Sequence, residues 1–187
     1  MTKWTLNQWF NFIAFQALWP LCVIGAAHET LWPGTVLASV MLCWHGFGVS
    51  RCSDLQLAAI ALCAGYLLDS LWINLDFLRF SAPWPMPQLA PVWIAVLWIG
   101  FGLSINHSLA WMKAWPRLCS ALLMLLAPFS YFCAERLGAV EILAQPWEMV
   151  LYLGGTWSVL VYLLLFIAKY GLPGLLPKLR STSEMTP

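Results

Sequence analysis

Two polar residues interrupt long apolar stretches of this 187-residue sequence, and both could take part in proton exchange. Asp69 is a carboxylic acid that could act as a general acid or base, and Tyr131 could hydrogen-bond to it. On a helix, Tyr66 lies one turn before Asp69 and Asp76 lies two turns after it, on the same face. One hypothesis gives Asp69 and Tyr131 a catalytic, substrate-binding or proton-exchanging role. The alternative is a hydrogen bond that only locks helices together.

A second group of polar residues surrounds His107. Asn106 and Ser108 flank this histidine, Ser104 lies about one helical turn before it, and His45 occupies an earlier apolar stretch. Imidazole and carboxamide groups can bind, orient or protonate a ligand. The alternative is that each histidine hydrogen-bonds to backbone or to lipid headgroups. Because no carboxylate is expected beside the two histidines, they make a poor metal site.

Four residues are therefore the candidate catalytic residues: Asp69, Tyr131, His107 and Asn106. The sequence contains no Gly-rich dinucleotide motif, no P-loop, no HExxH pair and no Gly-x-Ser-x-Gly motif. We therefore expect no cofactor and no bound metal. Whether the protein is an enzyme is left open by these residues alone.

The composition indicates the solvent in which these residues must be positioned. Apolar residues make up 61% of the chain and charged residues 9%, with a formal net charge of +1. Soluble domains usually carry about 25% charged residues, so this chain has too few to cover a water-exposed surface. The absence of clustered Lys and Arg also excludes a nucleic-acid partner. The expected partners are membrane lipid and other membrane proteins.

Long apolar stretches predict an all-α, polytopic integral membrane protein with six transmembrane helices, because about 20 apolar residues cross a bilayer as a helix. They form a single domain over residues 1–170. A short cytoplasmic tail over 171–187 is expected to be disordered. The six expected spans are 8–28, 33–50, 54–76, 91–112, 116–135 and 148–169.

The distribution of Lys and Arg predicts that both termini are cytoplasmic. If the chain starts in the cytoplasm, the outer segments contain only Arg79 and Arg136. The inner segments contain seven basic residues: Lys3, Arg51, Lys113, Arg117, Lys169, Lys178 and Arg180. Such an excess on one side marks the cytoplasmic face.

The same spans sort the polar residues by depth. At about 1.5 Å per residue, Asp69 and Tyr131 reach a similar level near the outer face. His107 and His45 lie near the inner face, about 15 Å from Asp69 along the membrane normal. A direct pair between His107 and Asp69 is therefore not expected.

The longest outer connection, residues 77–90, contains three prolines at alternate positions: Pro83, Pro85 and Pro87. These residues favour extended backbone over helix. The segment is either a stiff linker at the membrane surface or a lid over an outward-facing pocket.

Several short patches resemble a family of small bacterial inner-membrane proteins that is catalogued only as a domain of unknown function. The patches run from Asn11 to Ala27, Leu68 to Ser70, Pro91 to Trp98, Asn106 to Trp111 and Pro128 to Ala139, and the resemblance covers about residues 8–170. It implies a multi-pass protein of the bacterial inner membrane without an established activity. It also implies a connection with fatty-acid or phospholipid modification.

Three functions fit these features. The protein could be an enzyme, or the subunit of an enzyme, that modifies a lipid or isoprenoid, with Asp69 as general acid or proton relay and Tyr131 as its partner. It could instead be a small proton-coupled transporter in which Asp69 is protonated. A structural or assembly partner in a membrane complex is the third function, with close helix contacts at the small residues of 100–102 and 154–155.

Overall fold

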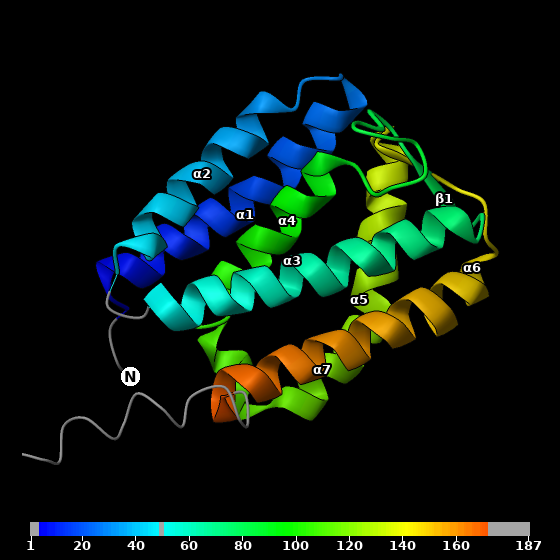
Figure 1. The fold of residues 1–187 in the computed structure, drawn as a ribbon. Coiled ribbons are helices and arrows are strands. Elements are labelled where there is room, and N and C mark those ends of the chain that lie inside the picture. The colour runs from blue at the N-terminus through cyan, green and yellow to red at the C-terminus, as the bar shows by residue number, and fades with distance from the viewer. Residues whose placement is uncertain (1–3, 49–50, 172–187) are drawn as a thin grey trace, which may run out of the picture.

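The computed structural model describes residues 4–48 and 51–171, which form helices and one small sheet (Figure 1). The elements are α1 (Leu6–Ala27), α2 (Trp32–Gly46), α3 (Arg51–Asn74), β1 (Leu78–Phe80), α4 (Val92–Ser104), the 3₁₀ turn η1 (Ala110–Ala114), α5 (Pro116–Arg136), β2 (Val140–Ile142), α6 (Pro146–Glu148), the π-helical turn η2 (Met149–Gly154) and α7 (Gly155–Tyr170). The expected tail lies outside the described residues except for Gly171.

Local sequence signals explain where several helices begin. Thr5 caps α1, because its side-chain oxygen accepts from the backbone N–H of Gln8 while the Gln8 side chain accepts from the backbone N–H of Thr5. Proline stands in the first turn of α2, α5 and α6, where its missing N–H costs no helical hydrogen bond.

Four helical stretches are long and apolar enough to cross a membrane. They are α1, α3, α5 and the continuous helix Pro146–Tyr170, which comprises α6, η2 and α7. These stretches support the expectation of an all-α membrane protein. α2 has 15 residues and α4 has 13, so neither reaches that length.

The fourth expected span, 91–112, is wrong in its second half. α4 ends at Ser104, and the chain continues through turns into η1. The sequence between them is rich in Ser, Asn and His, whose side chains compete with the helix for backbone hydrogen bonds. This interruption brings Asn106 and His107 out of a regular helix.

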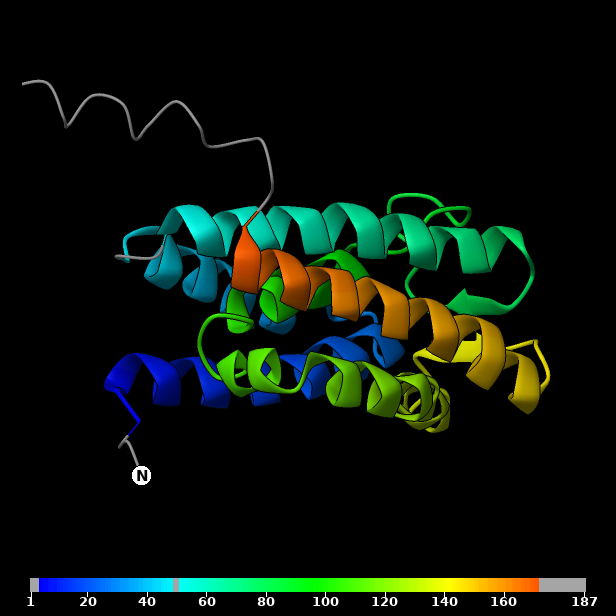
Figure 2. The ribbon, with the colours of Figure 1, turned by 90° about the horizontal axis from the view of Figure 1, so that it is seen from below.

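α4 is a central helix that packs against α1, α2 and α3. Gly102 permits the close approach to α3, since a Cβ there would lie 2.5 Å from the Ala58 Cα. α7 contacts both α3 and α5, and Figure 2 shows it between them. The bundle therefore places residues of α3, α4, α5 and α7 around a shared interior.

A close contact also marks the π-helical turn at η2. Gly154 packs directly against the backbone carbonyl of Met124 on α5. Pro128, four residues after Met124, has no N–H to give to that carbonyl. The glycine therefore allows η2 to approach α5 at the point where the proline interrupts the hydrogen bonds of α5.

The loops between helices form a two-stranded antiparallel sheet that the sequence analysis did not predict. β1 pairs with β2, and Arg79 lies opposite Glu141, with 3.8 Å between their charged groups. The proline-rich connection folds back onto the start of α4, where the Val92 N–H donates to the Trp84 carbonyl over 3.1 Å. Trp84 itself is 64% exposed, so its side chain remains at the surface.

Candidate functional site

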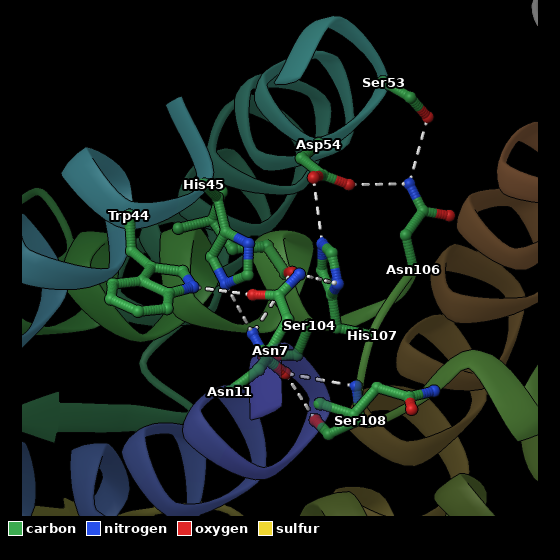
Figure 3. Close-up of polar contacts among 12 residues, drawn as sticks. Asn7, Asn11, Trp44, His45, Ser53, Asp54, Ser104, Asn106, His107 and Ser108 are labelled. Carbon is green, nitrogen blue, oxygen red and sulfur yellow. Dashed lines mark hydrogen bonds and ion pairs between the residues drawn. The ribbon is translucent and has the colours of Figure 1, made fainter. Parts of the chain in front are cut away.

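The polar residues of the interior fall into two clusters with different partners. The Asp69 cluster consists of Asp69, Trp98 and Tyr131. The His107 cluster consists of Asn7, Asn11, Trp44, His45, Ser53, Asp54, Asn106, His107, Ser108 and Lys113, and Figure 3 labels all of these except Lys113. No hydrogen bond or ion pair found within 4–48 and 51–171 joins the two clusters. The expectation that His107 and Asp69 are not a direct pair agrees with this arrangement.

Both carboxyl oxygens of Asp69 accept hydrogen bonds in a fully buried position. The Tyr131 hydroxyl donates to Oδ1, and the Trp98 indole N–H donates to Oδ2 over 2.7 Å. The three residues come from α3, α4 and α5, so the carboxyl group links three helices. The sequence places Asp69 and Tyr131 at one depth, and the structure brings them into contact.

Gly65 allows Trp98 to reach Asp69. It lies one turn before Asp69 on α3, and a Cβ at this position would overlap the Trp98 ring. On its other side the Trp98 ring stacks on Trp157 of α7, with centroids 4.3 Å apart and planes tilted by 27°. The indole is therefore fixed between a glycine and a second aromatic ring.

A cavity of about 300 Å³ lies beside the Asp69 cluster. Its walls are largely apolar and aromatic, with contributions from Trp19, Phe80, Trp93, Phe101, Met112 and Trp157. Among the described residues, Asp69 is the one charged side chain that lines it. The buried indole N–H of Trp157 makes no hydrogen bond of standard geometry within the described part of the chain, although it lies near the Tyr131 hydroxyl. The cavity thus combines an apolar interior with a carboxyl group, a phenol and an available N–H donor.

The His107 cluster contains a carboxylate that the sequence analysis missed. His107 Nε2 lies 2.9 Å from Asp54 Oδ2. The Asn106 amide donates to Asp54 Oδ1 over 2.9 Å and to the Ser53 hydroxyl over 3.0 Å. The expectation that no carboxylate lies near the histidines is therefore wrong, because the first turn of α3 turns Asp54 inward.

Lys113 extends this cluster toward the surface. Its ammonium group donates to Asn106 Oδ1 over 2.9 Å. Partial burial lowers the pKa of Lys113 below the usual lysine value, while the negative charge of Asp54 opposes this effect. Asn106 therefore connects a half-buried cation to the buried carboxylate.

Two asparagines of α1 hold the histidine rings from the opposite side (Figure 3). Asn7 Nδ2 lies 3.2 Å from His107 Nδ1, and Asn11 Nδ2 lies 3.0 Å from His45 Nε2. Asn11 Nδ2 also lies 3.4 Å from the Leu103 carbonyl. The Asn11 oxygen accepts from the backbone N–H and the hydroxyl of Ser108. Asn11 thus satisfies backbone groups where α4 ends inside the protein.

By distance alone, His45, Asp54 and His107 could hold a metal ion. One possible ligand atom from each residue lies within 4.8 Å of the other two, and all three residues are buried. A metal-bound histidine normally donates its second ring N–H to an acceptor. Here the second nitrogen of each ring faces an amide NH₂ group, which is itself a donor. The donor set therefore does not fit a metal in this arrangement.

The four candidate residues divide evenly between the clusters. Asp69 and Tyr131 hydrogen-bond to each other. Asn106 and His107 both hydrogen-bond to the Asp54 carboxylate. The sequence does not predict their partners Trp98 and Asp54. One sequence feature could have indicated a large partner for Asp69. Gly65 precedes Asp69 by four residues, so both lie on one helix face, and the missing side chain of the glycine leaves room there for a large ring.

One protein family, described as "Protein of unknown function (DUF2878)", matches residues 8–163. No curated protein and no solved structure matches the chain.

Proposed function

This chain belongs to the DUF2878 family of proteins of unknown function, and we propose that it binds a membrane lipid or isoprenoid in the Asp69 cavity and modifies it, alone or as the subunit of an enzyme. In this proposal the protein is a multi-pass protein of the bacterial inner membrane. It crosses the membrane six times, with α2 and α4 as the two short crossings and both termini in the cytoplasm.

The cavity beside Asp69 is the observation that carries this proposal. Its volume of about 300 Å³ is at the lower end of the range for small-molecule sites, about 300–1,000 Å³. Aromatic and aliphatic walls favour an apolar chain, which a membrane supplies at high local concentration. A few polar groups in an apolar cavity are typical of a site that orients its ligand.

The polar groups indicate how such a ligand would be oriented. The Trp157 N–H could donate to a carbonyl or hydroxyl oxygen of the ligand, because it lies near Tyr131 but makes no hydrogen bond of standard geometry within the described residues. The Tyr131 hydroxyl lies at the same wall and donates to Asp69. Asp69 would then orient Tyr131 and exchange a proton through it as general acid or base.

Mass spectrometry of the purified protein tests the binding step. Ala127 lines the cavity and is 4% exposed, so Ala127→Leu should fill part of it. Ala121 is an exposed alanine of the same helix, and Ala121→Leu is the matched control. We expect one lipid species to be enriched in the wild type and in Ala121→Leu. Its occupancy should fall at least about tenfold in Ala127→Leu, or about 1.4 kcal/mol in binding free energy.

Asp69→Asn separates binding from chemistry. This variant should still bind the lipid but fail to convert it when the bound species is incubated with the membrane fraction. The proposal would be contradicted if the wild type bound no lipid species above its share of the bulk lipid. Equal lipid occupancy in Ala127→Leu and Ala121→Leu would also contradict it. Flux across proteoliposomes that depends on Asp69 would favour a transporter, and loss of a membrane complex without loss of lipid would favour an assembly partner.

A further inference from the structure

The hydrogen-bond partners of Asn7 and Asn11 fix the orientation of both carboxamides. Trp44 Nε1 lies 2.6 Å from Asn7 Oδ1, and an indole N–H can only donate. The amide NH₂ of Asn7 must therefore face His107. For Asn11, the backbone N–H of Ser108 requires the oxygen on one side, and the Leu103 carbonyl requires the NH₂ group on the other.

These orientations determine which nitrogen of each imidazole carries a proton. His107 Nδ1 accepts from Asn7, so the proton of the neutral ring is on Nε2 and is donated to Asp54 over 2.9 Å. His45 Nε2 accepts from Asn11, so the proton of that ring is on Nδ1. Figure 3 shows His45, Asp54 and His107 pointing toward one another. The arrangement directs an imidazole N–H toward a carboxylate and leaves the lone pair of His107 Nδ1 facing α1.

We propose that the His107 cluster is a proton-binding site in which His107 takes up one proton on Nδ1 and Asn7 changes its hydrogen-bond partner in response. The proton comes from water and adds to the lone pair of Nδ1, while Nε2–H remains bonded to Asp54. The product is an imidazolium–carboxylate ion pair. Nδ1–H then needs an acceptor, so the Asn7 carboxamide rotates and presents Oδ1 to it. The Trp44 indole N–H loses its acceptor and bonds to water.

The positions of Asn7 and Trp44 make this exchange feasible. Asn7 is half-buried in the first turn of α1, and Trp44 is 47% exposed near the end of α2. Water can therefore reach the indole N–H once it is released, and no unsatisfied donor remains buried. The exchange links proton uptake to the contact between α1 and α2.

The charged groups around His107 favour a single proton. On α3, Asp54 stabilises the imidazolium by its negative charge. On α2, the ring centroid of His45 lies 4.2 Å away, so a second proton there would be repelled. On η1, Lys113 bonds to Asn106 and adds a positive charge at the far side of Asp54. The side chains of α1 that contact the two rings, Asn7 and Asn11, do not titrate.

Nuclear magnetic resonance of the full-length protein in lipid nanodiscs tests the site. With ¹⁵N-labelled histidine, His107 should show a protonated Nε2 and an unprotonated Nδ1 at the alkaline end of a pH series, and two protonated nitrogens once the proton is taken up at the acidic end. With ¹⁵N-labelled tryptophan, the Trp44 indole signal, assigned by Trp44→Phe, should move with the same midpoint. Trp32, at the other end of α2 and 67% exposed, is the matched control whose signal should not move.

Three variants test whether the Trp44 transition follows the protonation of His107. His107→Gln should abolish it, while His45→Gln should retain it. Asn7→Asp should raise the midpoint of His107 protonation, read from the ring nitrogens, by about one pH unit or more, a tenfold gain in proton affinity. It should also suppress the movement of the Trp44 signal, because a carboxylate accepts from both Trp44 and the new N–H.

Three results would overturn the proposal. The first is a Trp44 signal that does not depend on pH. The second is a transition that survives His107→Gln but disappears in His45→Gln. The third is a stoichiometric response of the His107 nitrogens to Zn²⁺ at constant pH, which would identify a metal site instead. The nitrogen shifts of His107 in the wild type test the tautomer directly, even if a variant does not fold.

Discussion

Replacing Gly65 by alanine tests whether the packing of Trp98 positions the Asp69 cluster. The new methyl group would overlap the Trp98 ring, which is 2% exposed and stacks on Trp157, so any displacement of the ring disturbs this stacking. Overpacking of a core typically costs about 1–3 kcal/mol. A displaced indole would also leave Asp69 Oδ2 without its donor, which adds about 1–3 kcal/mol.

The helix propensity of alanine offsets part of this cost. Alanine is favoured over glycine by up to about 1 kcal/mol in a helix interior. The net expectation for Gly65→Ala is therefore a loss of about 3 kcal/mol in the free energy of unfolding. Gly155 is the matched control, because it is also helical and a Cβ there meets no atom within 4 Å. Gly155→Ala should leave stability unchanged or increase it by up to about 1 kcal/mol.

Reversible unfolding in mixed micelles would measure both values. A double-mutant cycle adds a second measurement, since the cost of Gly65→Ala should fall by more than about 1 kcal/mol when Trp98→Leu has removed the ring. If Gly65→Ala and Gly155→Ala have the same effect, or if the cycle shows no coupling, the glycine does not position Trp98. The account of the Asp69 cluster would then be refuted.

Three further substitutions have defined outcomes in the same unfolding assay. Tyr131→Phe should cost about 1–3 kcal/mol, because Asp69 loses a buried donor, and equal stability of the two proteins would contradict that hydrogen bond. Gly102→Ala should cost about 3 kcal/mol, the upper end of the usual overpacking cost, since the new methyl group meets backbone atoms of Ala58 rather than a side chain that can move, and equal stability of the two proteins would contradict this contact. Asn11→Leu should cost about 2–5 kcal/mol by leaving several buried groups unpaired, and a smaller loss would show that water replaces the amide.

The sequence predicts the helices well where apolar residues alone determine them. The expected spans at 8–28, 54–76 and 116–135 differ from α1, α3 and α5 by at most three residues at any end. The expected span at 91–112 is too long, because its high content of apolar residues outweighs the polar residues that follow Ser104 and end α4. A hydropathy pattern cannot show that Ser108 and Asn11 hydrogen-bond to each other, since 97 residues separate them.

The candidate sites show the same limit. Depth along the helices was enough to bring Asp69 and Tyr131 together, because both lie well inside long spans. Asp54 stands at the first turn of α3, where an acidic side chain usually faces water, so its burial could not be predicted from position. The strands β1 and β2 were missed because each has three residues, too few for a periodic pattern.

In the proposed six-span arrangement, the lengths of α2 and α4 determine how the protein fits its membrane. At about 1.5 Å per residue, 15 and 13 residues span about 22 and 20 Å, against about 30 Å of hydrocarbon. Such a hydrophobic mismatch is met by local thinning of the bilayer. Lipids with shorter acyl chains should therefore stabilise this protein more than lipids with longer acyl chains. Figure 1 shows α2 next to α1 at one side of the bundle, and the lipid beside α2 must adapt most.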